Sequence, residues 1–252
     1  MTEDFKIKKV LKETKELPSG FGFYPKGAKV WFSPMTTREV EILNESELSS
    51  KLLYENAIAN ITTENMNSED LTFSDFIFIN LQRRLYSQTE IRCTLQTTCK
   101  NCGKSITEEF DFNEIEFETP KDSRLQRCQL GEYKVDIGPL TIGGVLKMLN
   151  SEKGVNNIDT LAHCVRKIYP LDSEVKNIYS FELAQEIMAN TWGEEREILE
   201  YIDSLQSHSI KPREIICSNC NTSWKEELGD PEALIFPSDR PRQSIADKVL
   251  PV

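Results

Sequence analysis

The chain has 252 residues, 38% of them hydrophobic and 28% charged, which is the composition of a globular protein long enough to bury a core. No apolar run approaches the ~18 residues of a membrane-spanning helix, and the N-terminus has no signal-peptide core, so we expect function in a reducing cytosol. A formal net charge of −11 argues against general nucleic-acid binding, which depends on clustered Lys and Arg.

The N-terminal part predicts a small sheet followed by helices. Residues 1–15 alternate charged and apolar positions and predict a tail or an edge strand, and the aromatic segments 21–24 and 28–32 predict a hairpin. A threonine cap with a carboxylate downstream begins a helix within 35–43. Apolar spacing predicts two more helices, over Glu47–Asn60 and Ser74–Tyr86. The polar segment between them, Thr62–Glu69, predicts a loop.

Two Cys-x-x-Cys motifs are the most informative feature of the chain. The first holds Cys99 and Cys102, and the second holds Cys217 and Cys220. Two residues between the cysteines let both sulfurs turn toward one ion, and four thiolates complete a tetrahedral structural zinc site. Such a site has no open position for water or substrate, so it indicates a structural zinc rather than a catalytic one.

The spacing of the motifs is unusual for a zinc ribbon, because residues 103–216 separate them, whereas a compact ribbon has about 15–20 residues there. The flanks still favour a ribbon, since strands are predicted on both sides of each motif, over 91–98, 105–112, 214–216 and 222–227. Two alternatives stay open: two unrelated reduced thiol pairs, or a thioredoxin-like redox pair in one motif. Neither motif follows a strand and opens an apolar helix, as redox motifs do.

The segment between the motifs predicts an inserted subdomain. It begins with a strand over Gly131–Gly138 and a helix over Thr141–Leu149. Helical spacing recurs over Ile158–Ile168, Phe181–Ala189 and Glu194–Leu205. After the second motif, turn residues and prolines predict an extended tail.

The remaining chemistry-bearing residues give little support for catalysis. Cys93, Cys128 and Cys164 lie in apolar surroundings as expected for buried free thiols, and Cys93 fits no short knuckle with Cys99. His163 is expected to lie on an apolar helix and to pack in the core; the adjacent Cys164 points about 100° away, too far for a Cys-His pair. His208 is expected in a solvated loop. The glycines of 138–144 predict a strand-to-helix turn rather than a phosphate-binding loop. The acidic residues of 194–197 predict the solvated start of a helix.

Several blocks together resemble the baseplate hub and hub-assembly proteins of T-even-type contractile-tailed bacteriophages. An aromatic strand runs into Ser33-Pro34 and the helix start over 35–43, and a second block, Leu71–Arg84, forms an Asp-aromatic helix ending in Arg. The two cysteine motifs bracket a helical segment. The sequence departs from the family pattern in two places. Ser33 precedes the proline where the family has an arginine, and residues 83–87 follow the family's Arg-x-Lys-Ser pattern only loosely.

The resemblance implies a non-enzymatic protein that packs against other phage tail proteins, in the host cytoplasm during assembly and in the virion tail baseplate if retained. It is compatible with a structural subunit or with an assembly factor that leaves. A zinc-ribbon nucleic-acid-binding or transcription-associated module is the main alternative, and a thiol oxidoreductase is a third hypothesis.

The expected fold class is α+β, in which a small N-terminal β-sheet with helices is followed by zinc-ribbon-like β knuckles that bracket an inserted helical subdomain. The domains expected are a strand and helix domain with a flexible tail over residues 1–88, a discontinuous zinc-ribbon-like module over 89–120 and 211–230, a mainly helical insert over 121–210, and an extended tail over 231–252.

Overall fold

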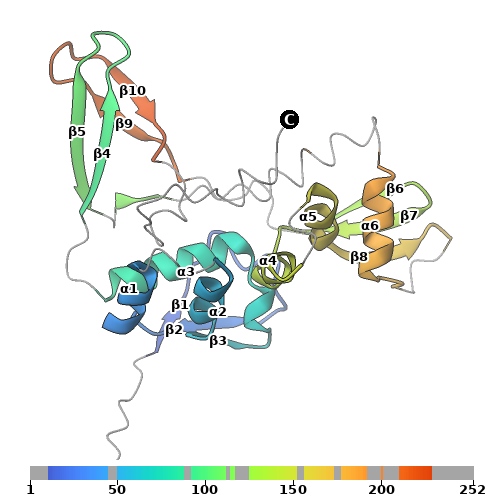
Figure 1. Cartoon of the computed structure of the whole chain (residues 1–252). Coiled ribbons are helices and arrows are strands. Elements are labelled where there is room, and N and C mark those ends of the chain that lie inside the picture. Colours follow the sequence, from blue (N-terminus) through green and yellow to red (C-terminus); the bar gives the residue numbers. More distant parts are fainter. Residues whose placement is uncertain are drawn as a thin grey trace, which may run out of the picture.

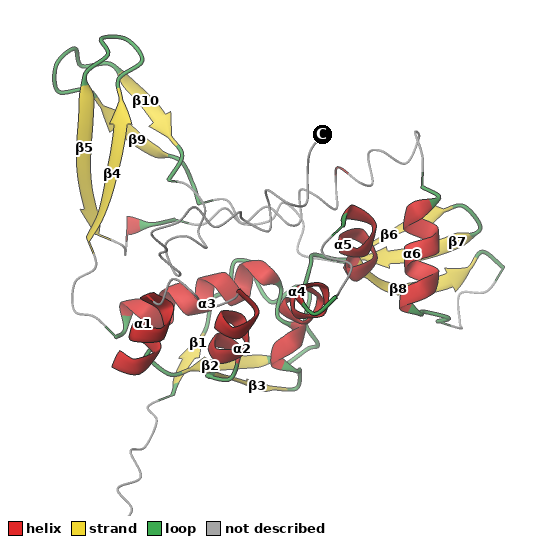
Figure 2. Ribbon diagram, viewed as in Figure 1, coloured by secondary structure: helices red, strands yellow, loops and turns green. Residues whose placement is uncertain are grey.

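The computed structural model describes residues 11–44, 50–87, 92–111, 114–116, 125–151, 156–172, 177–191, 200 and 210–228. The fold is α+β as expected, with helices and small antiparallel sheets (Figures 1 and 2). Most of the predicted helix over 194–205, His208 and the tail over 231–252 lie outside the described residues. No helix within those residues is long and apolar enough to cross a membrane.

The N-terminal sheet has three antiparallel strands in the order β1-β2-β3, with β1 at Lys12–Thr14, β2 at Lys29–Phe32 and β3 at Ile61–Glu64. The predicted hairpin is wrong: residues 21–24 form turns, and β2 pairs with β1, inside the segment expected to be a tail or edge strand. The expected loop over Thr62–Glu69 begins as β3. β1 is an edge strand, so that expectation is confirmed.

A buried hydrogen-bond network explains why residues 21–24 leave the sheet. The Tyr24 hydroxyl contacts the Asp75 carboxylate and accepts a hydrogen bond from Thr72 N at 2.9 Å. The backbone N–H of Ser19 donates to Asp75 Oδ1 at 3.0 Å. Asp75 is fully buried, and burial raises its pKa although these hydrogen bonds oppose the shift. The aromatic segment is therefore held against the start of a helix instead of pairing with β2.

Side-chain caps mark the starts of two helices of this region, α1 (Thr37–Asn44) and α3 (Phe73–Leu85). The region also contains α2 (Ser50–Ile58) and the short 3₁₀ helix η1 (Ser68–Asp70). Before α1, Glu39 N donates to Thr36 Oγ1 at 3.2 Å and Thr36 N donates to Glu39 Oε2 at 2.8 Å, which is a reciprocal capping box. Thr72 caps α3 by accepting from Asp75 N at 3.2 Å.

The insert contains a second three-stranded antiparallel sheet, order β6-β7-β8, and three helices. The elements are β6 (Gln126–Leu130), β7 (Tyr133–Ile137), α4 (Ile142–Leu149), α5 (Asn157–Cys164), β8 (Val165–Pro170) and α6 (Phe181–Ala189). The single helix expected over Ile158–Ile168 is wrong in its second half, because Val165 and Ile168 are buried in β8 and pair with β7. The expectation of a mainly helical insert is therefore incomplete.

Helix α4 joins the insert to the N-terminal part. Backbone bonds run from Phe73 N to Leu140 O at 2.8 Å and from Ile142 N to Leu71 O at 2.9 Å. A Cβ on Gly143 would lie 2.9 Å from Glu69 O, so glycine lets α4 approach η1 closely. The glycines of this turn therefore serve packing, and the buried hydrophobic residues of both regions form one continuous core.

Two further hairpins contain the cysteine motifs. The first pairs β4 (Arg92–Thr98) with β5 (Ser105–Asp111), and the second pairs β9 (Arg213–Ile216) with β10 (Ser223–Glu226). These strands confirm the four predicted from the flanks of the motifs. We call the two hairpins together the double hairpin; in Figure 1 they lie side by side. Its buried Phe110 and Ile215 are not part of the main core.

Candidate metal centre

Each cysteine motif forms a tight knuckle between two strands. In the first, Gly103 N donates to Cys99 O and Cys99 N donates to Lys104 O, both at 2.9 Å. In the second, Asn221 N donates to Cys217 O at 2.8 Å, and Cys217 N donates to Thr222 O at 2.9 Å. Gly103 and Asn221 both have positive φ, at 71° and 54°, the left-handed conformation that Gly and Asn tolerate best. The two knuckles therefore share one backbone conformation.

The knuckles bring the four predicted cysteines together. Their sulfurs all lie within 4.8 Å of one another. Cys99 Sγ lies 3.7 Å from Cys220 Sγ, and Cys102 Sγ lies 3.6 Å from Cys217 Sγ. Four sulfurs about 2.3 Å from a tetrahedral ion would be about 3.8 Å apart. The cluster could therefore bind one metal ion.

The four cysteine sulfurs would complete the coordination of a bound ion. Cys99 and Cys217 are buried, at 1% and 0% exposure, while Cys102 is exposed at the rim. Four thiolates would fill the tetrahedral positions of an ion, so no position remains for a water or a substrate. The arrangement is chemically suited to holding two chain segments together.

Polar neighbours favour the thiolate form of two of these cysteines. The hydroxyl of Thr222 lies 3.3 Å from Cys220 Sγ, and hydrogen bonds from its side chain and backbone lower the pKa of Cys220 to about 6. The backbone N–H of Lys104 and then the side chain of Asn219, 3.6 Å from Cys102 Sγ, lower the pKa of Cys102. Because the thiolate is the metal-binding form, these contacts favour metal binding at neutral pH.

The side chains of Thr222, Asn219 and Asn101 next to the sulfurs were not predicted from the sequence. Asn101 Nδ2 donates to Thr222 Oγ1 at 3.1 Å, so the first knuckle also contacts the second through an amide. Each motif has an asparagine immediately before its second cysteine, Asn101 in one and Asn219 in the other. That repeated Asn-Cys pair was the available signal.

Arg213 is a second link between the hairpins that the sequence did not reveal. Its guanidinium donates to Glu108 at 2.9 Å and to Glu114 at 2.8 Å, and its Cζ lies 4.6 Å from the Phe110 ring centroid. Next to it, Lys211 N donates to Glu116 O at 2.8 Å. Solvent-accessible ion pairs contribute about 0–1 kcal/mol each. On their own, these ion pairs would hold the two hairpins together only weakly.

Among the candidates that the structure describes, no second reactive site is formed by His163, Cys164 or Cys93. His163 stacks on the Phe181 ring at 4.4 Å, and burial, followed by the charge of Lys147, lowers its pKa to about 4. Cys164 Sγ donates to Thr160 O at 3.4 Å, so its thiol is directed to the backbone of its own helix. Cys93 lies opposite Phe110 in the β4–β5 ladder.

Comparison with protein-family models gives a match over residues 6–233, to the family described as T4 bacteriophage base plate protein. The chain belongs to this family. Comparisons with curated proteins and with solved structures gave no significant match. Membership of the base plate family confirms the resemblance drawn from the short sequence blocks and supports a structural role in the phage tail.

The two sequence blocks that carried this base plate resemblance meet in the structure. Arg83, at the end of α3, has a side chain only 1% exposed and forms an ion pair with Glu39 of α1. Its Nε donates to Ser33 O at 2.9 Å and its Nη1 to Asn80 Oδ1 at 3.0 Å. Burial alone would raise the pKa of Glu39, but hydrogen bonds from Thr36 and Arg83 outweigh burial and lower it. The blocks therefore meet at one buried ion pair.

Proposed function

We propose that this base plate family member is a non-enzymatic structural or assembly component of the baseplate hub, which acts through contacts with other phage tail proteins. The observation that carries the proposal is the family match over residues 6–233. The closed cysteine cluster supports it, because a site without an open coordination position serves stability rather than chemistry.

We assign the ion as zinc, one per chain, bound by Cys99, Cys102, Cys217 and Cys220. A tetrahedral set of four thiolates suits zinc, which is redox-inactive and forms closed structural sites of this composition. The staple would fix the start and the end of a long insertion to each other. Residues 103–216 would then be closed into one loop by the metal, which explains the unusual spacing.

The redox alternative is not favoured by the geometry of the sulfurs. A thioredoxin-like pair uses two cysteines of one motif, with the first at the start of a helix. Here close sulfur contacts run between the motifs, from Cys99 to Cys220 at 3.7 Å and from Cys102 to Cys217 at 3.6 Å. Both motifs lie between β-strands, so the helix that lowers the pKa of such a thiol is absent from this part of the chain.

The nucleic-acid alternative is not favoured by charge. Strand β5 and the residues after it carry Glu108, Glu109, Asp111, Glu114 and Glu116. The guanidinium of Arg213 is paired with two of these acids. Binding to phosphates depends on clustered basic side chains, and this surface presents the opposite charge.

A gene-replacement experiment tests the proposed role. In a phage that lacks this gene, we expect no complete baseplates, and expression of the wild-type protein from a plasmid should restore them. Electron microscopy of infected-cell lysates and plaque counts measure the outcome. Complete, infectious tails without the protein would contradict the proposal. Immunodetection in purified virions distinguishes a retained tail subunit from an assembly factor that acts in the host cytoplasm and leaves.

A further inference from the structure

The outer edge of β1 offers a surface for strand addition. β1 pairs with β2 on one side only, and no other described strand lies on its outer side. An edge strand presents a row of backbone N–H and C=O groups that can pair with another strand. Such an edge can bind an extended segment of a second protein chain.

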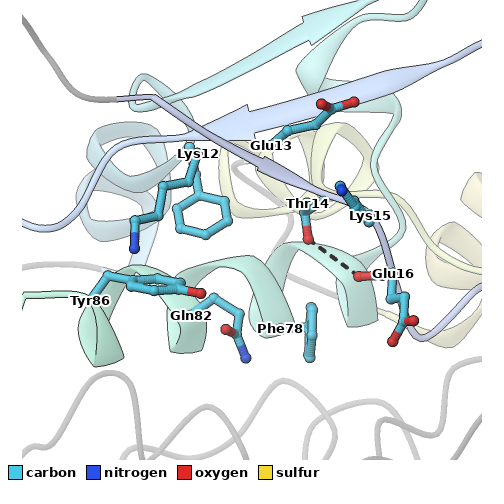
Figure 3. A pocket seen from close by; sticks show the side chains of 9 residues that line it. Lys12, Glu13, Thr14, Lys15, Glu16, Phe78, Gln82 and Tyr86 are labelled. Carbon is cyan, nitrogen blue, oxygen red and sulfur yellow. Dashed lines mark hydrogen bonds between the residues drawn. The ribbon is translucent and has the colours of Figure 1, made fainter.

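An open groove of about 660 Å³ follows this edge (Figure 3). One wall is β1 with the two residues that follow it, from Lys12 to Glu16. The floor includes Phe78 and Gln82 of α3 and Tyr86 at its C-terminal cap, each four residues after the last. Lys12 lies opposite the buried Phe32 in the ladder and extends toward the helix, with its Nζ 3.1 Å from the Tyr86 ring centroid. An added strand would therefore have room beside β1 and above α3.

The charges along this edge are complementary to those of a second copy of the same edge that runs antiparallel to it. β1 and the two residues after it read Lys12-Glu13-Thr14-Lys15-Glu16. In an antiparallel pair with a two-fold axis at Thr14, Lys12 faces Glu16 of the second copy and Glu13 faces Lys15 of the second copy. The two Thr14 residues face each other. Opposite charges and Thr–Thr pairs directly across an antiparallel ladder are both stabilising.

The same pattern disfavours the neighbouring registers. A slip by one residue places Lys12 opposite Lys15, or Glu13 opposite Glu16, depending on its direction. A slip by two residues places Glu13 opposite Glu13 or Lys15 opposite Lys15. Like charges directly opposite are destabilising. The pattern therefore specifies one register around Thr14.

We propose that two copies of this chain associate through antiparallel pairing of their β1 edges, centred on Thr14. The two N-terminal sheets then form one sheet that is continuous across the dimer. The contact is isologous, so the same edge serves both copies and the assembly closes as a dimer. This inference rests on the edge, the groove and the charge pattern, and it is independent of the proposed zinc site.

Charge reversal tests the pairing on the full-length protein by sedimentation equilibrium. We expect the wild type to dimerise, and both Lys12→Glu/Lys15→Glu and Glu13→Lys/Glu16→Lys to weaken the dimer at least ~10-fold. An equimolar mixture of these two variants should form a heterodimer, because every opposing pair is then of opposite charge. Lys12→Glu/Glu16→Lys is the matched control: it also removes the Lys12–Tyr86 contact but keeps complementarity, and should dimerise like the wild type.

A monomeric wild type, dimers insensitive to charge reversal, or a mixture that stays monomeric would overturn the proposal. A second measurement needs no substitution and applies even if a variant fails to fold. Hydrogen exchange of the wild type should show more protection of the β1 amides at high than at low protein concentration. Protection of β1 that does not change with concentration would also overturn it.

Discussion

Replacement of Cys220 by serine is expected to release the metal and to separate the two hairpins of the double hairpin. Serine is a poor zinc ligand, and binding of a structural zinc contributes about 10–16 kcal/mol in zinc-finger peptides. The contacts that remain between the hairpins include the Arg213 and Lys211 ion pairs and the Asn101–Thr222 and Asn219–Cys102 hydrogen bonds. These together are worth a few kcal/mol at most.

The measurement is hydrogen exchange resolved by segment. Amides of β4, β5, β9 and β10 should lose protection in Cys220→Ser, while those of α2 and α3 keep theirs, because the main core does not include the double hairpin. Cys128→Ser is the matched control, since Cys128 is a half-buried cysteine outside the cluster. Equal protection of all four strands in wild type and Cys220→Ser would refute the structural role of the site.

Replacement of Arg83 by methionine is expected to destabilise the main core by about 3–5 kcal/mol, because it leaves partners of a buried charge unpaired. The Glu39 carboxylate, Ser33 O and Asn80 Oδ1 would each lose a donor. Methionine retains most of the apolar stem, so the loss reports chiefly on hydrogen bonds and charge.

Chemical denaturation of the full chain measures this effect. Arg38→Met is the matched control, because Arg38 lies on α1 near Glu39 but is exposed, and its replacement should change the free energy of unfolding by less than ~0.5 kcal/mol. Glu39→Gln should cost less than Arg83→Met, since the amide can still accept a hydrogen bond. If Arg83→Met were as stable as Arg38→Met, the ion pair would not stabilise the core.

Local signals in the sequence predicted the elements that local chemistry determines. The capping box at Thr36 and Glu39 marked the start of α1, and apolar spacing marked α3 to within one residue at each end. The cysteine motifs marked both knuckles, because two-residue spacing and a left-handed residue are properties of a few consecutive positions. These features need no information about distant parts of the chain.

The errors arose where distant contacts decide the structure. Residues 21–24 have the composition of a strand, yet Tyr24 contacts Asp75, which is 51 positions away, and the segment turns into the core. Val165–Pro170 continues a helical pattern, yet it pairs with β7 because its β-branched residues fill the second sheet. Arg213 contacts Glu108 across 105 positions, and nothing near either residue indicates that pairing.

The most direct test of the central claim is the metal content of the wild-type protein, purified under reducing conditions without chelator. Elemental analysis is combined with a count of reactive thiols before and after denaturation. The account predicts one zinc per chain, and protection of Cys99, Cys102, Cys217 and Cys220 until the metal is removed. Protein that folds fully without metal, with these four thiols freely reactive, would contradict the zinc staple.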